Sequence, residues 1–326
     1  MSSQALLHLI TGLVVVGFVA EEVLAWLNLR HMRTGIPDEI AGFYDPEKYQ
    51  KSLLYHRETN RAGLIQSLFG FALTLTVLLT GALGLLDAAL RQVTQHPVYL
   101  PLLFFAALAL MSDVLSLPFQ LYHTFVIEEK YGFNRTTFKT FVTDKLKGYM
   151  LGAVLGGSLL AVFLILVQHI GAAFWVLFLV VAAVFMLFIH IFYASLILPL
   201  FNKLTPLEDG ELKTAIEQLA GQIGFPVKNI LVMDGSRRSG KANAFFTGLG
   251  KRKKIVLYDT LINKHTVDEL LAVLAHEIGH YKKVPYCNGL CAVGTANGCY
   301  SVCPVAYGVY RRIVVCPGRP GICRPS

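Results

Sequence analysis

Two histidines and one glutamate have the residue types and spacing of a metal-dependent hydrolytic centre. They form the run His276-Glu277-Ile278-Gly279-His280 in a chain of 326 residues. Residues four positions apart share one face of a helix, so His276 and His280 can offer two imidazoles to one zinc ion. Glu277 follows the first of them and is rotated around the helix, where its carboxylate can take a proton from water.

The neighbouring residues favour a metal site over a chance match on a surface helix. Thr266 and Glu269 have the spacing of a capping box, which predicts that a helix starts there. The stretch LLAVLA at 270–275 predicts an apolar helix face that packs inside the protein. Such packing would bring both histidines into an interior cleft.

A second candidate element is the run SGKANAFFTGLG at 239–250. An edge strand beside a peptidase cleft can pair with an extended substrate through its backbone, and Asn243 and Ala244 are candidates for that strand. Gly248 and Gly250 predict a hairpin turn. From the residues alone, a hairpin without substrate contact is the favoured interpretation.

Five apolar segments precede these elements, and they predict a multispan α-helical membrane protein. Only 15% of the residues are charged, against about 25% in a soluble domain. Each segment is close to the roughly 20 residues that span a bilayer. The predicted spans are residues 5–27, 64–86, 98–127, 150–167 and 172–200.

The basic residues gather in alternate loops of this predicted bundle. Residues 28–63 hold six Lys or Arg and residues 128–149 hold five, whereas 87–97 hold one. The positive-inside rule therefore predicts an N-terminus outside the membrane and a cytoplasmic region after residue 200. The net charge of +8 suits a membrane surface, and no nucleic-acid-binding motif is present.

The chain changes character after the last apolar segment. Residues 208–223 predict an amphipathic helix, and short strand-like runs follow at 230–233, 244–246 and 254–258. We therefore expect a membrane domain over 1–205 and the start of an α/β zinc-metallopeptidase domain over 206–283. A Cys-, Pro- and Gly-rich tail follows over 284–326, and it holds all six cysteines.

Several isolated polar residues have more ordinary interpretations. Asp113 and His190 lie in apolar runs, where a satisfied packing or cavity-lining role is at least as good an explanation as a functional one. Glu128 and Glu129, followed by Lys130, are expected to form a solvated face at the end of a span.

Three stretches give the chain a resemblance to the type I CAAX prenyl proteases. They are PFQLYHTFVIEEKYGFNRTTF at 118–138, SGKANAFF with the later IVLYDTL, and VDELLAVLAHEIGHYKK at 267–283. The resemblance implies a membrane zinc endopeptidase with seven spans around a chamber. It also implies that His276 and His280 bind one zinc ion and that Glu277 is the general base. Asn243 and Ala244 would then line the substrate strand, against the hairpin interpretation above.

The resemblance also implies partners and a location. The substrate would be a peptide or protein, with a prenylated C-terminus in an organism that prenylates proteins, and membrane lipid would surround the spans. The implied location is the bacterial inner membrane or, in a eukaryote, the endoplasmic reticulum. Nucleic acid is not an expected partner.

The chain departs from the family pattern after Lys283. The family's third ligand is a Glu far downstream, but no Asp, Glu or His follows His280 here. We therefore expect an incomplete zinc site, weak zinc binding and an inactive copy whose tail arises from a reading-frame slip or misassembly. Two alternatives stay open: a catalytically dead membrane protein that binds peptides, and a scaffold with an accidental motif. A cysteine-based metal site in the tail is a further rival.

Overall fold

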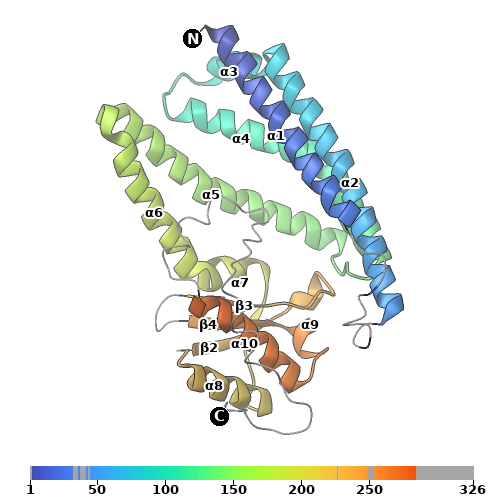
Figure 1. Cartoon of the computed structure of the whole chain (residues 1–326). Coiled ribbons are helices and arrows are strands. Elements are labelled where there is room, and N and C mark those ends of the chain that lie inside the picture. Colours follow the sequence, from blue (N-terminus) through green and yellow to red (C-terminus); the bar gives the residue numbers. More distant parts are fainter. Residues whose placement is uncertain are drawn as a thin grey trace. The chain divides into compact units, whose positions relative to one another are not determined.

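The computed structural model describes residues 2–31, 36, 42, 45–225, 227–248 and 253–283. It divides into two units, Met1–Leu274 and Ala275–Ser326, each of which is described by itself. Figure 1 shows long helices in the first part of unit 1 and a small sheet with further helices after them. The expected tail at 284–326 and the turn residues Gly250 and Lys251 lie outside the described residues.

Five helical segments in the described residues are long and apolar enough to cross a membrane, with mean hydropathies of 1.9 to 2.8. This finding confirms the prediction of a multispan α-helical protein. The segments are α1 Ser3–His31, α2 Pro46–Thr80, α4 Tyr99–Tyr122 continued by η2 His123–Glu128, α5 Phe138–Ile170, and α6 Phe174–Phe192 continued by η4 Tyr193–Ile197 and α7 Leu198–Phe201.

The second predicted span is wrong at its C-terminal end. Helix α2 stops at Thr80 and Gly81 adopts a left-handed conformation with φ of 71°. A separate amphipathic helix, α3 (Ala82–Val93), begins directly after it. Glycine reaches this conformation without the steric cost of a Cβ, so a single residue breaks an apolar run that hydropathy treats as continuous.

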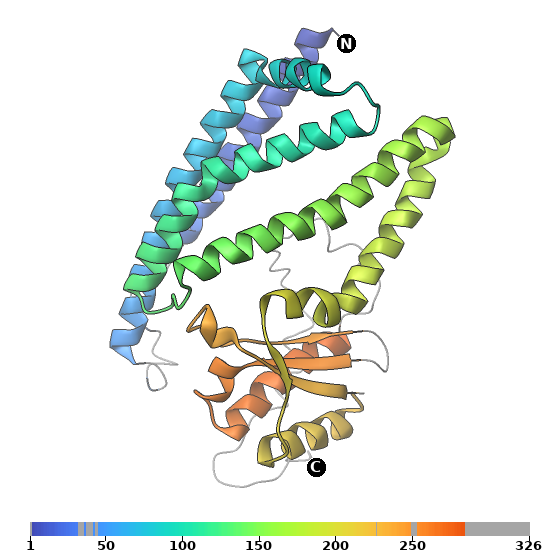
Figure 2. The same cartoon turned by 180° about the vertical axis from the view of Figure 1, so that it is seen from behind.

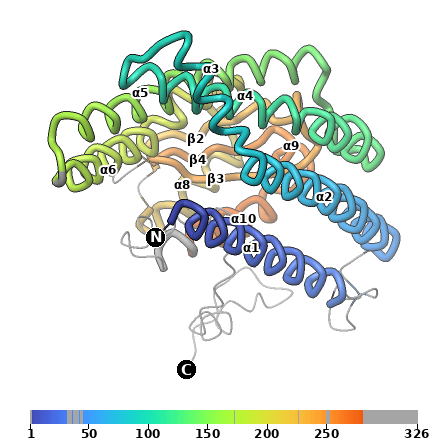
Figure 3. The backbone as a smooth tube through the Cα atoms, turned by 90° about the horizontal axis from the view of Figure 1, so that it is seen from above, coloured from blue at the N-terminus to red at the C-terminus, as the bar shows by residue number. Residues whose placement is uncertain are grey.

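Aromatic and polar side chains join neighbouring long helices. Phe18 of α1 stacks on Phe71 of α2 with ring centroids 4.0 Å apart, and the two helices run side by side in Figure 3. Between α4 and α5, Lys145 Nζ donates to both oxygens of Asp113 at 2.6 Å, and Tyr149 also donates to Asp113. Asp113 is therefore fully hydrogen-bonded, as the packing interpretation requires.

The region after the fifth span contains a four-stranded sheet of order β1-β2-β4-β3. The strands are β1 Leu204–Pro206, β2 Val227–Met233, β3 Ala244–Thr247 and β4 Lys253–Tyr258. Strand β4 pairs parallel with β2 and antiparallel with β3. The three predicted strands are confirmed, but the short β1, which pairs antiparallel with β2, was not predicted.

Helix α8 (Glu211–Ile223) and the first part of α10 (Val267–Lys283) cover one face of this sheet. Ile216 of α8, Ile255 of β4 and Leu274 of α10 share a core in which each is at most 1% exposed. Gly224 ends α8 with φ of 65°, at the predicted end of this helix. The short segments η3 Gly171–Ala173, η5 Gly235–Arg237 and α9 Asp259–Ile262 complete the described fold.

The other face of the sheet packs against the end of the fifth membrane-length segment. Side chains alternate across a strand, so Val256 points away from its neighbours Ile255 and Leu257. Val256 packs with Ala194 of η4 and Leu198 of α7 in a second buried cluster. Figure 2 shows α7 beside the strands on this side. The sheet is thus attached directly to a membrane-length helix.

Candidate functional site

The helix that carries the His-Glu-His run begins at a capping box. Thr266 N donates to Glu269 Oε2 at 2.9 Å, and Glu269 N donates to Thr266 Oγ1 at 3.4 Å. These are the reciprocal bonds that the spacing predicted, and they satisfy backbone donors that the first turn of a helix leaves unpaired. The bond from the backbone of Thr266 holds the pKa of the Glu269 carboxyl below its usual range.

One face of α10 is fully buried. Leu270, Leu274 and Ile278 recur at four-residue intervals and are 1%, 0% and 2% exposed. His276 lies about half a turn from Leu274 and is exposed, and Glu277 is half-buried. The buried apolar face was predicted correctly, and the interior cleft expected around the histidines stays a prediction.

The helix continues unbroken past Gly279 and contains position 280. Positions 276 and 280 therefore share one helical face, as two ligands of one ion require. The side chain of His280 lies outside the described residues. Two imidazoles at this spacing are a donor set that suits zinc, so the residues present fit two of the three protein ligands of a catalytic site. The described residues contain no group of three or more potential metal ligands.

The candidate substrate strand lies at one edge of the described sheet, where β3 pairs only with β4. The carbonyl of Asn243 accepts from Tyr258 N at 3.1 Å, and its side-chain oxygen accepts from Ala244 N at 2.9 Å. Ala244 opens the strand and is 8% exposed. Gly248 begins the hairpin turn with φ of 93°. The hairpin and the edge position are both present, and both were anticipated.

Residues 238–241, which lead into this strand, are bonded to the loop between α4 and α5. Gly240 N donates to Phe133 O at 2.8 Å and Arg135 N donates to Arg238 O at 3.1 Å. A Cβ at Gly240 would lie 3.2 Å from the carbonyl oxygen of Gly132. Thr136 Oγ1 also donates to Arg238 O, 102 positions away in the sequence. The YGFN loop and the SGKANA run thus form one structural element.

A charged side chain strengthens this attachment. Lys241 Nζ donates to Glu128 Oε1 at 2.8 Å and to Tyr55 Oη at 3.0 Å, and it lies 5.0 Å from the ring centre of Phe133. Burial opposes the charge of Lys241, but the bonds to Glu128 and Tyr55 outweigh it and raise the pKa of the ammonium. The solvated face expected at Glu128 is wrong, because its side chain is only 12% exposed.

Arg238 makes the second charged link. Its guanidinium donates to both carboxylate oxygens of Asp144 at 2.7 and 2.9 Å and to Asn202 Oδ1 at 2.8 Å. Asp144 belongs to α5 and Asn202 follows α7, so one side chain ties the approach to β3 to two membrane-length segments. Sequence reasoning missed these links, since nothing in a single sequence pairs charges so far apart along the chain.

Comparison with known families gives two adjacent matches. The profile described as "CAAX prenyl protease N-terminal, five membrane helices" matches residues 25–203. The profile described as "Peptidase family M48" matches residues 206–303. The two matches are separated by residues 204 and 205, and the domain boundaries expected from the sequence stay predictions. The second match continues past Lys283, where we expected the tail to begin, and that boundary stays a prediction.

Individual proteins show the same similarity. The chain is 40% identical over 263 residues to "Probable CAAX prenyl protease 1" of Schizosaccharomyces pombe and 38% identical over 291 residues to "CAAX prenyl protease 1" of Saccharomyces cerevisiae. These alignments cover 77% and 84% of this chain but 56% and 63% of the relatives. The crystal structure of S. mikatae Ste24p matches with a TM-score of 0.78 and 35% identity, over 87% of this chain and 68% of that one.

Proposed function

Because the chain belongs to the CAAX prenyl protease family and to peptidase family M48, we propose that it is a zinc endopeptidase embedded in a membrane. Its substrates are the C-terminal regions of membrane proteins or lipid-modified proteins. The observation that carries the proposal is helix α10, which is capped, packed on the sheet core and bears His276, Glu277 and His280 in register. The chain spans less than two thirds of the two curated relatives above, so the activity is proposed from this helix and the family.

His276 and His280 would hold the zinc ion through their imidazoles, and Glu277 would serve as general base. When bound, zinc acts as a Lewis acid that polarises a peptide carbonyl and makes water more acidic. The carboxylate of Glu277 would take the proton from the attacking water and pass it to the leaving amine. The half-buried position of Glu277 is compatible with this role, because partial burial removes competing solvent.

The edge strand β3 would hold the peptide. An extended substrate can add to an exposed sheet edge through backbone hydrogen bonds, and Asn243 and Ala244 are the positions proposed to line it. Arg238 and Lys241 anchor the preceding segment to membrane-length helices. This attachment supports a substrate that arrives from the membrane, such as a prenylated C-terminus, because the binding strand then keeps a fixed position relative to the spans.

The test of the mechanism separates metal binding from proton transfer. Residues 1–283 are joined to the C-terminal part of the S. pombe relative, and zinc content and cleavage of a prenylated peptide are measured. Glu277→Gln should keep zinc and lose about 10²–10⁴-fold in turnover, since the amide cannot accept the proton. His276→Ala and His280→Ala should lose the zinc as well. Full turnover in Glu277→Gln would refute the mechanism.

A catalytically dead peptide-binding protein is the second candidate. The observation that favours it is the edge strand β3, which pairs only with β4 in the described sheet and can take up an extended peptide without any cleavage step. In that case the 326-residue chain should bind a prenylated peptide without cleaving it. Its affinity should be unchanged by Glu277→Gln and should fall when Ala244→Pro disturbs the edge strand.

We also propose a topology in which the N-terminus is outside and the sheet is cytoplasmic. The charge pattern of the loops supports it. The first 286 residues contain no cysteine, so a single cysteine can be placed in a variant whose tail cysteines are Ser. A reagent that cannot cross the membrane should label Gln92→Cys from outside and should not label Lys251→Cys. The reverse pattern would overturn the assignment.

A further inference from the structure

A cavity lined by residues remote in the sequence from the His-Glu-His run lies beside α2. It has a volume of about 1000 Å³ and is lined from α1, from α2 and from residues at and beyond the end of α4. Four of its lining side chains are basic, and only one is acidic. The basic residues are Lys51, Arg57, Arg61 and Lys130. A cavity with this excess of positive charge is suited to an anion.

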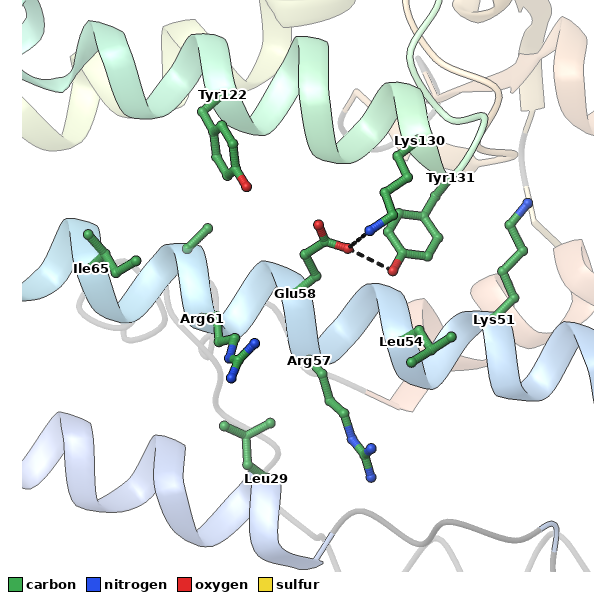
Figure 4. Close-up of a pocket in the computed structure, with 11 residues that line it drawn as sticks. Leu29, Lys51, Leu54, Arg57, Glu58, Arg61, Ile65, Tyr122, Lys130 and Tyr131 are labelled. Atoms are coloured by element: carbon green, nitrogen blue, oxygen red, sulfur yellow. Dashed lines mark hydrogen bonds and ion pairs between the residues drawn. The ribbon is translucent and has the colours of Figure 1, made fainter.

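The single carboxylate of the cavity does not neutralise the arginines. Glu58 accepts from Lys130 Nζ at 2.7 Å and from Tyr131 Oη at 2.9 Å. Figure 4 shows Glu58 directed toward these two residues, while Arg57 and Arg61 extend toward Leu29 of α1. Within the described residues, no carboxylate lies within ion-pair distance of either guanidinium. Two like charges four residues apart on a helix repel each other, and an anion between them would remove that cost.

The position of the cavity along α2 suits the headgroup region of a membrane. The helix begins with the polar residues PEKYQKS at 46–52 and becomes apolar from Leu64 onward. Arg57 and Arg61 lie just before that change. The loops on this side are the basic ones, which the positive-inside rule assigns to the cytoplasmic leaflet. Basic pockets between membrane helices at this level bind anionic lipid headgroups.

Apart from two tyrosines, the rest of the lining is apolar. Leu29, Leu54, Ala62 and Ile65 share the cavity with the arginines. A small soluble anion would leave this apolar surface exposed to water, whereas an amphiphile covers it with the upper part of an acyl chain. We propose that this cavity binds an anionic phospholipid, with the phosphate between Arg57 and Arg61 and the glycerol end against the apolar residues.

Lipid binding by the purified full chain in neutral detergent tests the proposal. Short-chain phosphatidylglycerol, phosphatidylcholine of equal chain length and inorganic phosphate are titrated separately, and bound lipid is counted by native mass spectrometry. We expect phosphatidylglycerol to bind most tightly. Arg57→Gln with Arg61→Gln should weaken it by roughly 30-fold, from about fivefold for each cation near an anionic lipid. Phosphatidylcholine binding should change little.

A matched variant controls for net charge. Lys139→Gln with Lys228→Gln removes the same two charges from exposed positions outside the cavity, and it should keep the preference for phosphatidylglycerol. Arg57→Lys with Arg61→Lys should also keep most of it, because the charges remain. Helix content by circular dichroism confirms that each variant folds. The proposal is overturned if the double Gln variant keeps the wild-type preference, if the control loses it equally, or if inorganic phosphate binds as tightly as phosphatidylglycerol.

Discussion

Different forces stabilise the sheet region and the bundle of long helices. In the sheet region, Ile255, Leu257 and Leu274 are completely buried. Helices α1 and α6 contain no buried residue at all within the described chain, and apolar side chains such as Leu179 remain 66% exposed. Apolar burial therefore orients α10, whereas it does little to orient the long helices.

The difference follows from the solvent of each region. Water drives apolar side chains of the sheet region into a core, but lipid tails are as apolar as leucine and supply no such drive. The long helices are instead joined by specific polar contacts, such as Asp113 with Lys145 and Ser67 with Glu22. The links between the two regions are polar as well, since Arg238 binds Asp144 of α5 and Lys241 binds Glu128 of η2.

The largest expected effect is a difference in the free energy of unfolding between substitutions at two leucines, one buried and one exposed. Leu274→Ala opens a cavity in the sheet core and should lower the free energy of unfolding by about 2–5 kcal/mol. Leu179→Ala removes the same atoms from an exposed position and should change it by no more than about 0.5 kcal/mol. Denaturant unfolding in mixed micelles measures both. Equal losses would mean that the long helices also depend on apolar packing.

Breaking the link between the two regions should have the next largest effect. Arg238→Met removes a two-bond contact with Asp144, whose side chain is 24% exposed, and should cost about 2 kcal/mol, as for hydrogen bonds to a charged group. Hydrogen exchange should rise in β3 and in residues 238–241 more than in β2. A uniform rise across the sheet would show that Arg238 acts on overall stability and not on the approach to β3.

Within the helix bundle, the Asp113–Lys145 pair should show a smaller coupling. A double-mutant cycle with Asp113→Ala and Lys145→Met should give about 0.6–1.7 kcal/mol, the range measured between membrane helices. The pair Asp87–Arg91 on α3 serves as the control, because its side chains are 40% and 58% exposed and surface pairs contribute little. A larger coupling in the control would reverse the comparison.

The smallest predicted effect is a pH dependence at the start of α10. The Glu269 carboxyl has a lowered pKa in the folded protein, so its contribution is present above the unfolded pKa of about 4.3. It is lost as the pH falls through the lower folded pKa. Glu269→Gln should remove this dependence while keeping an acceptor for Thr266 N. Unfolding midpoints at a series of acidic pH values would reveal it, and identical pH profiles would contradict the capping role.

Local patterns predicted much of this fold from sequence. The apolar period of α10, its capping box and the C-terminal end of α8 all depend on neighbouring residues, and all were predicted. The break at Gly81 within a predicted span was missed, because mean hydropathy over a window does not register a single glycine. The short β1 carries too few residues for a pattern, and its pairing with β2 is set by the fold.

The chemistry of the candidate site was predictable because its three residues lie within one helical turn. The residues that hold the proposed substrate strand were not, because Glu128 and Lys241 are 113 positions apart. Their pairing arises only when the end of η2 and the approach to β3 meet.

The central claim, that His276 and His280 hold zinc, can be tested most directly by X-ray absorption at the zinc edge. The 326-residue chain is loaded with a single equivalent of zinc. Its scattering shells are compared with those of the double variant that carries His276→Ala and His280→Ala. We predict two imidazole nitrogens at about 2.0–2.1 Å with oxygen filling the remaining positions, and loss of the imidazole signal in the variant. An unchanged spectrum in the variant, or a shell of sulfur at about 2.3 Å from the tail cysteines, would contradict the claim.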